Sequence, residues 1–285
     1  MTKTRLKPPC SYQGGKQRLA KKIVDIIFEQ NEINEDTKFY DLCCGSGAIT
    51  LELVNRGINP HNITMVDSGV YGTFWSKVAN NEVEIDLLKQ MVDSVPDKEE
   101  CKAYLENMST YVHEGYTYQY LLLQSGSFGG KEISLQDGKW KHHGFRAYWL
   151  PTETSVRRSP CNPMQPNPHE LYDRVCKIVD AIGGSPRVLN CKIETFLLQE
   201  RFSDNTIVYI DPPYMGTTGY SSELDVMSVV NGIPKNIPTY VSECNILSDE
   251  TYFITKGKSK GNITGSIKNK RKDDILNVFN RLHKE

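Results

Sequence analysis

The residues best suited to chemistry follow a short apolar run at 206–210, and they are Asp211, Pro212, Pro213 and Tyr214. The run is rich in β-branched and aromatic residues, so it predicts a buried parallel strand that ends at the acid. Because neither proline can donate a backbone hydrogen bond and both favour an extended chain, the carboxylate is held at a fixed place beside the tyrosine ring. A carboxylate, a proline carbonyl and an aromatic face together suit a planar base that carries an exocyclic amine.

A turn containing glycines forms a second candidate site. Residues 37–42 predict a strand, and the segment after it contains Cys43, Gly45, Ser46 and Gly47 before a helix begins. The turn lacks the third glycine of the dinucleotide fingerprint, which disfavours a pyrophosphate and therefore a Rossmann dehydrogenase. A cofactor with adenosine but no phosphates, such as S-adenosylmethionine, fits this pattern better.

An acid after the next strand supports that interpretation. Residues 63–66 predict a short strand that ends at Asp67, roughly 20 residues after the glycines. In nucleoside-binding Rossmann-like sheets an acid in this place holds the ribose diol. Asp67 is therefore a candidate ligand of the ribose.

The N-terminal loop is the third candidate. Gly14 and Gly15 lie between Tyr12 and Lys16, and two successive glycines let the backbone approach a ligand closely. Apolar residues at helical spacing follow and predict a helix over residues 16–30.

Strands and helices alternate at both ends of the chain. Further strands are predicted at residues 187–190 and 239–242. In the middle of the chain this alternation breaks down. The sequence therefore predicts the α/β fold class, with a sheet formed by residues 1–78 and 186–285 and an inserted lobe at 79–185.

The C-terminal segment has its own pattern. Residues 251–272 predict a β-hairpin with a basic, glycine-containing tip. After it, Ile275, Val278, Phe279 and Leu282 have the spacing of one helix face, which predicts a final helix.

Taken in chain order, these motifs resemble those of the Dam-type (D12 class) DNA adenine-N6 methyltransferases. That family has a Trp/Tyr-x-Gly-Gly-Lys loop, a Gly-x-Gly turn after a strand, a separate DNA-recognition insert and an Asp-Pro-Pro-Tyr motif. Residues 12–16, 41–47 and 211–214 match the loop, the turn and the last motif, and residues 263–276 resemble the end of the family's sequences. The likeness covers both parts of the predicted sheet.

The resemblance implies a Rossmann-like S-adenosylmethionine-dependent methyltransferase sheet with an inserted DNA-recognition lobe. It implies that Asp211 to Tyr214 act on the exocyclic N6 amine of an adenine flipped out of double-stranded DNA. The residues that it implies for cofactor binding are Tyr12, Gly14, Gly15, Lys16, Asp41, Cys43, Gly45, Ser46, Gly47, Asp67 and Asp211.

Positive charge is concentrated in two places, although the net charge is −1. Residues 251–272 contain seven Lys or Arg and no acid, and the insert interleaves cations with aromatics, which suits contact with phosphates and bases. The side chains expected to bind DNA are Lys131, Lys139, Lys141, Arg146, Arg157, Arg158, Lys268 and Lys270.

Two alternatives remain open from the sequence. The protein could instead transfer the methyl group to the exocyclic N4 amine of cytosine, which would need the same acceptors. It could also be a relative of this family that binds DNA without catalysing methyl transfer. The biological role, whether restriction-modification, regulation or protection of a mobile genome, is also open.

Composition sets the remaining expectations. The eight cysteines include no Cys-x-x-Cys pair and no histidine spaced to complete a zinc site, so we expect reduced thiols and no metal. No apolar run is long enough to span a bilayer and the N-terminus lacks a signal-peptide core, so we expect a cytoplasmic protein without membrane contact. We expect a monomer or a weak dimer.

Overall fold

The computed structural model describes residues 5–12, 14–150, 163–212, 224–255 and 273–280. Within these residues the main element is a seven-stranded sheet with the order β5-β2-β1-β6-β7-β9-β8. Five of its strands are parallel, and β9 and β8 form an antiparallel pair at one edge. The strands span Arg187–Leu189 (β5), Ile63–Val66 (β2), Lys38–Leu42 (β1), Thr206–Ile210 (β6), Thr239–Glu243 (β7), Asp274–Phe279 (β9) and Glu250–Thr255 (β8).

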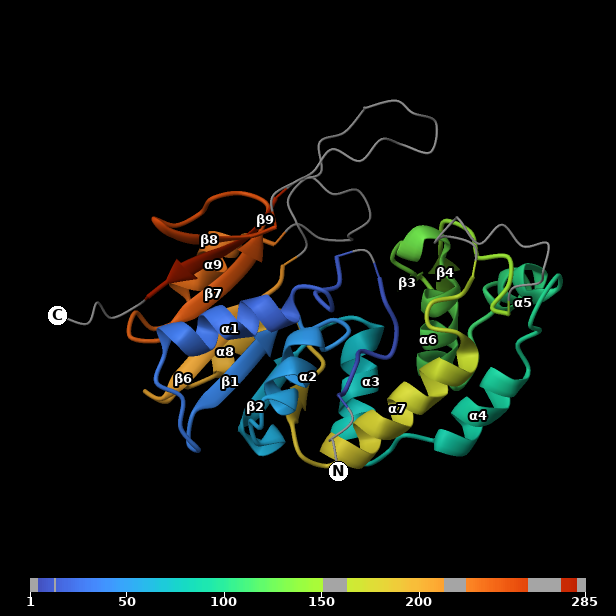
Figure 1. The fold of residues 1–285 in the computed structure, drawn as a ribbon, viewed down its shortest axis with the longest axis horizontal. Coiled ribbons are helices and arrows are strands. Elements are labelled where there is room, and N and C mark those ends of the chain that lie inside the picture. The colour runs from blue at the N-terminus through green and yellow to red at the C-terminus, as the bar shows by residue number, and fades with distance from the viewer. Residues whose placement is uncertain (1–4, 13, 151–162, 213–223, 256–272, 281–285) are drawn as a thin grey trace.

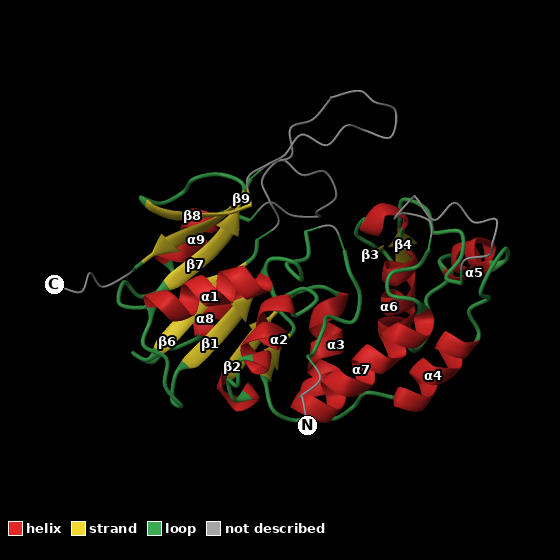
Figure 2. Ribbon diagram, in the orientation of Figure 1, coloured by secondary structure: helices red, strands yellow, loops and turns green. Residues whose placement is uncertain are grey.

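Helices cover both faces of the sheet (Figures 1 and 2). Along β6, Ile207 and Tyr209 belong to the apolar core that includes α1 (Ala20–Gln30), whereas Val208 and Ile210 belong to the core on the other face. This alternation follows from the two-residue period of a strand, and burial on both faces is typical of parallel sheets. The other helices against the sheet are α2 (Ala48–Asn55), α3 (Val70–Ala79), α8 (Ile193–Gln199) and α9 (Val226–Asn231), and a short 3₁₀ turn, η1 (Pro60–Asn62), precedes β2.

The strand order confirms the predicted fold class, an α/β protein with a Rossmann-like sheet of the methyltransferase type. The predicted strands at residues 37–42, 63–66, 187–190, 206–210 and 239–242 all lie in this sheet. None of the described helices is long and apolar enough to cross a membrane.

The middle of the chain is more regular than the sequence indicated. It is mainly helical, and in Figure 1 its helices lie beyond α3, on the side of the sheet away from β8 and β9. Its central helix, α6, is buried on every side from Thr117 to Gly126, as expected for a helix enclosed by other elements. The elements of this segment are α4 (Ile85–Asp93), α5 (Cys101–Met108), α6 (Tyr116–Gly126), η2 (Phe128–Gly130), β3 (Ser134–Gln136), β4 (Lys139–Lys141) and α7 (Pro168–Ile182).

The predicted final helix is wrong, because residues 274–279 form strand β9. This strand lies between β7 and β8, and Ile275, Leu276, Asn277 and Val278 are buried in succession. A strand covered on both faces is buried at successive residues, so its apolar residues can show helical spacing by coincidence. Of the hairpin predicted over residues 251–272, only the first strand agrees with the structure: β8 pairs with β9, which begins beyond residue 272, and residues 256–272 lie outside the described part of the chain.

Candidate cofactor and target site

The ends of three neighbouring strands bring the sequence motifs together. In the sheet, Leu42 at the end of β1 is paired with Val66 of β2 on one side and Ile210 of β6 on the other. The next residue in each strand therefore starts from the same edge of the sheet. Those residues are Cys43, Asp67 and Asp211.

The N-terminal loop joins this edge through an ion pair. Lys16 Nζ lies 2.5 Å from Asp211 Oδ1, and it also donates to the carbonyl of Gly14 at 2.9 Å. Both side chains of the pair are largely buried, with 5% and 12% of their surface exposed. Burial raises the pKa of Asp211, and the positive charge of Lys16 acts in the opposite direction. The pair fixes the N-terminal loop to the Asp-Pro-Pro motif.

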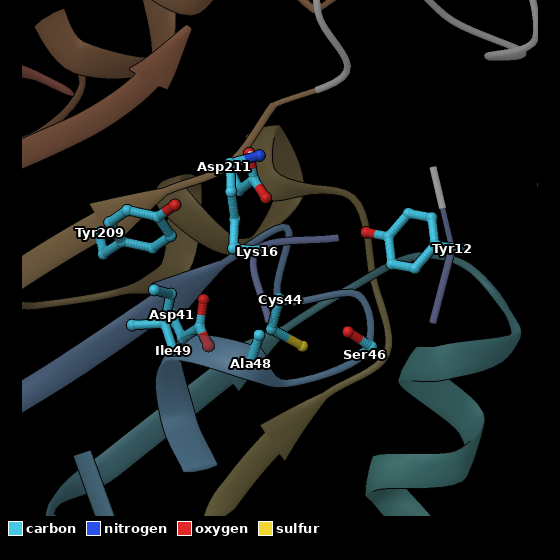
Figure 3. Close-up of a pocket in the computed structure, with 9 residues that line it drawn as sticks. All are labelled: Tyr12, Lys16, Asp41, Cys44, Ser46, Ala48, Ile49, Tyr209 and Asp211. Carbon is cyan, nitrogen blue, oxygen red and sulfur yellow. The ribbon is translucent and has the colours of Figure 1, made fainter. Parts of the chain in front are cut away.

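A hollow lies between the loop and the strand ends (Figure 3). It is shallow, and the hydroxyl of Tyr12 points toward the other residues around it. Its lining residues are Tyr12, Lys16, Asp41, Cys44, Ser46, Ala48, Ile49, Tyr209 and Asp211.

The turn after β1 requires glycine for two reasons. Gly45 and Gly47 have φ angles of 48° and 72°, in the left-handed region that residues with a side chain rarely adopt. A Cβ atom on Gly45 would lie 2.4 Å from the hydroxyl of Tyr12, and one on Gly47 would lie 2.3 Å from the ring of Trp75. Trp75 Nε1 also donates to the Gly45 carbonyl at 2.8 Å. The shape of the turn is therefore set by two aromatic side chains.

Cys43 in the same turn also has a left-handed conformation, with φ of 60°. For a residue with a side chain this costs about 1–2 kcal/mol. Such strain persists where the surrounding structure enforces it, and it is common at binding sites. Burial raises the pKa of the Cys43 thiol, so the group stays protonated.

Asp67 ties this turn to the end of β2. Its Oδ2 accepts from the backbone N–H of Gly45 at 2.9 Å, and its Oδ1 accepts from that of Gly69 at 2.8 Å. Burial raises the pKa of Asp67, and these backbone hydrogen bonds act against that rise. Because a carboxylate has about four acceptor sites, Asp67 keeps some capacity to accept from a ligand beside its backbone hydrogen bonds.

Asp41 connects the end of β1 to α2 through Thr50. Its side chain is buried, and Oδ2 accepts from the N–H of Thr50 at 3.1 Å and from the Thr50 hydroxyl at 2.7 Å. Burial raises the pKa of Asp41 to about 7, with smaller contributions in the same direction from Asp211 and Asp67. Asp41 therefore positions α2 and the turn, in addition to lining the hollow.

The charges around the hollow fit a cationic cofactor without phosphates. Asp41 and Asp211 line it, and Asp67 follows β2 at the same edge of the sheet, whereas Lys16 is the single cation among the described lining residues and is paired with Asp211. Pyrophosphate would meet three carboxyl groups here. The sulfonium and ammonium groups of S-adenosylmethionine would find opposite charges, and Asp67 would accept from its ribose.

The predicted DNA-binding residues have different environments. Lys131, Lys139 and Lys141 are exposed, and the last two flank the buried Trp140 on β4. Arg146 is buried, and its guanidinium donates to the carbonyls of Ser127 and Pro163, so it holds the inserted segment together. The predicted residues outside the described part of the chain are Pro213, Tyr214, Arg157, Arg158, Lys268 and Lys270.

Some residues of the site were not predicted. Trp75 shapes the glycine turn, and Tyr209 lines the hollow with its hydroxyl 2.7 Å from that of Ser242. The alternation of β6 does place Tyr209 on the same face of the sheet as Asp211. The contact of Trp75 depends on the packing of α3, which leaves no local signal in the sequence.

We expect Gly47→Ala to destabilise the protein more than Gly138→Ala. The two glycines have similar φ angles, 72° and 68°, but a Cβ on Gly138 would meet no atom within 4 Å. The left-handed conformation should cost each variant about 1–2 kcal/mol, and the contact with Trp75 should cost Gly47→Ala a further 1–3 kcal/mol, roughly. Urea denaturation measures both losses, and equal losses would contradict the role of Trp75.

We also expect Asp41→Asn to change how stability depends on pH. The folded-state pKa of Asp41, about 7, lies above the ordinary value of about 4. The folded protein therefore holds this proton more tightly, and its stability falls by up to about 1.4 kcal/mol per pH unit as the pH rises between these values. The variant lacks this loss, so it should gain on the wild type between about pH 5 and pH 7 in urea denaturation. Parallel pH profiles for the two proteins would rule this out.

Comparisons with known proteins add little. No family model matches the chain, and no curated protein sequence matches it. Among solved structures, the rRNA methyltransferase aviRa from Streptomyces viridochromogenes aligns with a TM-score of 0.37 and 12% sequence identity, over 94% of this chain and 86% of that one. The fold assignment above rests on the strand order and not on this likeness.

Proposed function

We propose that the protein is an S-adenosylmethionine-dependent DNA methyltransferase that modifies the exocyclic N6 amine of a flipped adenine in double-stranded DNA. The observation that carries the proposal is the in-register placement of Asp67 and Asp211 on either side of the turn after Leu42, with Lys16 joined to Asp211. In the proposal, Asp67 is the acid that binds the nucleoside and Asp211 is the acceptor for the amine, and both lie at one edge of the sheet.

The cofactor half of the proposal uses the N-terminal loop and two strand ends. Asp67 would accept from the ribose, and the turn from Cys43 to Gly47 would hold the methionine and adenosine parts. Tyr12, Gly14, Gly15, Lys16 and Asp41 would complete that site. When bound, S-adenosylmethionine supplies an electrophilic methyl group on a sulfonium centre.

The target half depends on Asp211 and on the carbonyl of Pro212. An amine conjugated to a purine ring is a poor nucleophile because its lone pair is delocalised. Two acceptors that hold its hydrogens favour a pyramidal nitrogen whose lone pair points out of the ring plane. Lys16 fixes one carboxylate oxygen of Asp211, so the acceptor is already oriented before the base enters.

Base flipping is part of the proposal because the amine is buried in a duplex. Extrusion costs a few kcal/mol, and stacking on Tyr214 would recover roughly 1–3 kcal/mol. Phosphate contacts are proposed for Lys131, Lys139 and Lys141, which are exposed, and for Arg157, Arg158, Lys268 and Lys270. Arg146 is left out of this set because its guanidinium already binds two backbone carbonyls of the inserted segment.

The direct test is transfer of a labelled methyl group from S-adenosylmethionine to duplex DNA, with the modified nucleoside identified by mass spectrometry. N6-methyladenine is the expected product. If the product is N4-methylcytosine, the target base is cytosine and not adenine. If the protein binds the cofactor but transfers no methyl group, it is better described as a DNA-binding relative that lacks turnover.

We expect Asp211→Ala to reduce methyl transfer at least about a hundredfold, while cofactor binding survives in part. The variant removes the acceptor for the amine, and it also leaves the largely buried Lys16 without its ion pair. Transfer assays and calorimetry with S-adenosylmethionine measure the two effects separately. Asp225→Ala is the matched control, because Asp225 caps α9 and is exposed. Normal turnover by Asp211→Ala would refute the proposed mechanism.

A further inference from the structure

Two residues of the N-terminal loop, Cys10 and Tyr12, contact the same side chain of α3. That side chain is Tyr71, in the first turn of the helix, and its hydroxyl lies 3.0 Å from Cys10 Sγ, a hydrogen-bond distance. The ring of Tyr71 also meets the ring of Tyr12, with centroids 5.7 Å apart and planes tilted by 41°. Cys10 and Tyr71 are buried, so the polar contact is protected from water. The loop is therefore joined to α3 by a hydrogen bond and by an aromatic contact.

The Tyr12 ring extends from this contact to the hollow. Its hydroxyl lies against the glycine turn, because a Cβ atom on Gly45 would be only 2.4 Å from it. Figure 3 shows Tyr12 at the margin of the hollow, with the hydroxyl directed toward the other lining residues. The orientation of Tyr12 at the hollow is thus set by Tyr71 on α3 together with Gly45.

The inserted segment supports Tyr71 and the loop from the other side. Tyr120 of α6 packs edge-to-face on Tyr71 with ring centroids 5.1 Å apart, and both side chains are buried. Arg174 of α7 donates to the carbonyl of Pro8 at 3.0 Å, which joins a second helix of the segment to the loop. Packed interiors deform little, so Tyr71 has little freedom to leave its place.

We propose that Tyr71 is a positioning residue for the cofactor site, which holds the N-terminal loop so that Tyr12 is oriented to receive S-adenosylmethionine. This inference rests on the proposed function, since it takes S-adenosylmethionine as the ligand. Tyr71 is not among the described residues that line the hollow, so it acts through Cys10 and Tyr12. A loop that is ordered in advance costs less free energy to fix when the ligand binds. Loss of the Tyr71 hydroxyl therefore weakens cofactor binding and leaves the methyl-transfer step unchanged.

Calorimetry of the purified full chain with S-adenosylmethionine measures this effect. We expect Tyr71→Phe, which removes only the hydroxyl, to bind roughly threefold to tenfold more weakly than the wild type. Cys10→Ala should lose a similar factor, and Cys10→Ser should lose less because serine keeps a hydrogen-bonding hydroxyl. The double variant should bind about as well as either single variant, since both substitutions break one contact.

Tyr118→Phe is the matched control. Tyr118 is a fully buried tyrosine of α6, and its hydroxyl accepts from the backbone N–H of Glu84 at 2.6 Å. Both tyrosine variants lose a buried hydroxyl, so urea denaturation should show similar losses of stability, but Tyr118→Phe should keep the wild-type affinity. Equal losses of affinity in the two variants would overturn the proposal, because a general loss of stability would then explain them. Equal affinity of the wild type and Tyr71→Phe would overturn it as well.

Two further measurements separate this inference from the proposed function. In the transfer assay, Tyr71→Phe should raise KM for S-adenosylmethionine at unchanged kcat, and the reverse result would contradict a role in cofactor binding. Hydrogen exchange without ligand should be faster at the Gly15 amide, which donates to the Tyr12 carbonyl at 3.0 Å, in Tyr71→Phe but not in Tyr118→Phe. If the wild type does not bind S-adenosylmethionine, the proposed function fails, and the exchange measurement still decides whether Tyr71 holds the loop.

Discussion

The register of β2, β1 and β6 is the constraint on which the candidate site depends. Parallel pairing sets Val66, Leu42 and Ile210 side by side, so the residue after each begins at one edge of the sheet. A slip of one residue in either pairing would turn its side chains to the opposite face, and the two apolar cores oppose this because they lie on different faces. The placement of Asp67 and Asp211 is thus enforced by burial elsewhere in the sheet.

The same arrangement has an electrostatic cost. Burial raises the pKa of Asp41, Asp67 and Asp211. Among the described residues that line the hollow, Lys16 is the single cation, and its charge balances the carboxylate of Asp211 alone. Unfavourable charge at a site is relieved when a ligand of opposite charge or with several donors binds there. If S-adenosylmethionine binds here as proposed, it loses its positive charge when it gives up the sulfonium methyl. An acidic site therefore favours the reactant form over the spent form, which helps product release.

Much of this organisation could be predicted from the sequence, because it follows from local patterns. The strands that end at Asp67 and Asp211 are recognisable from their β-branched residues. Because the carboxyl ends of parallel strands meet at one edge of a sheet, the two acids are then predicted to lie close together. Strand β9 could not be predicted correctly, since Ile275 and Val278 have helical spacing and only the neighbouring strands make them part of a sheet. The contact of Trp75 with the glycine turn depends on how α3 packs, which no local pattern encodes.

The inserted segment and the cofactor site share one packed row of aromatic rings. Trp140 stacks on Tyr120 with centroids 6.1 Å apart, Tyr120 meets Tyr71, and Tyr71 lies 5.7 Å from Tyr12, whose hydroxyl adjoins Gly45. The exposed side chains of Lys139 and Lys141 flank the buried Trp140 at the end of this row away from Tyr12. Packed interiors deform little, so a shift of β4 must either move Tyr120 or break its stacking with Trp140. If β4 contacts DNA as proposed, that contact lies at one end of a row of packed rings whose other end is Tyr12.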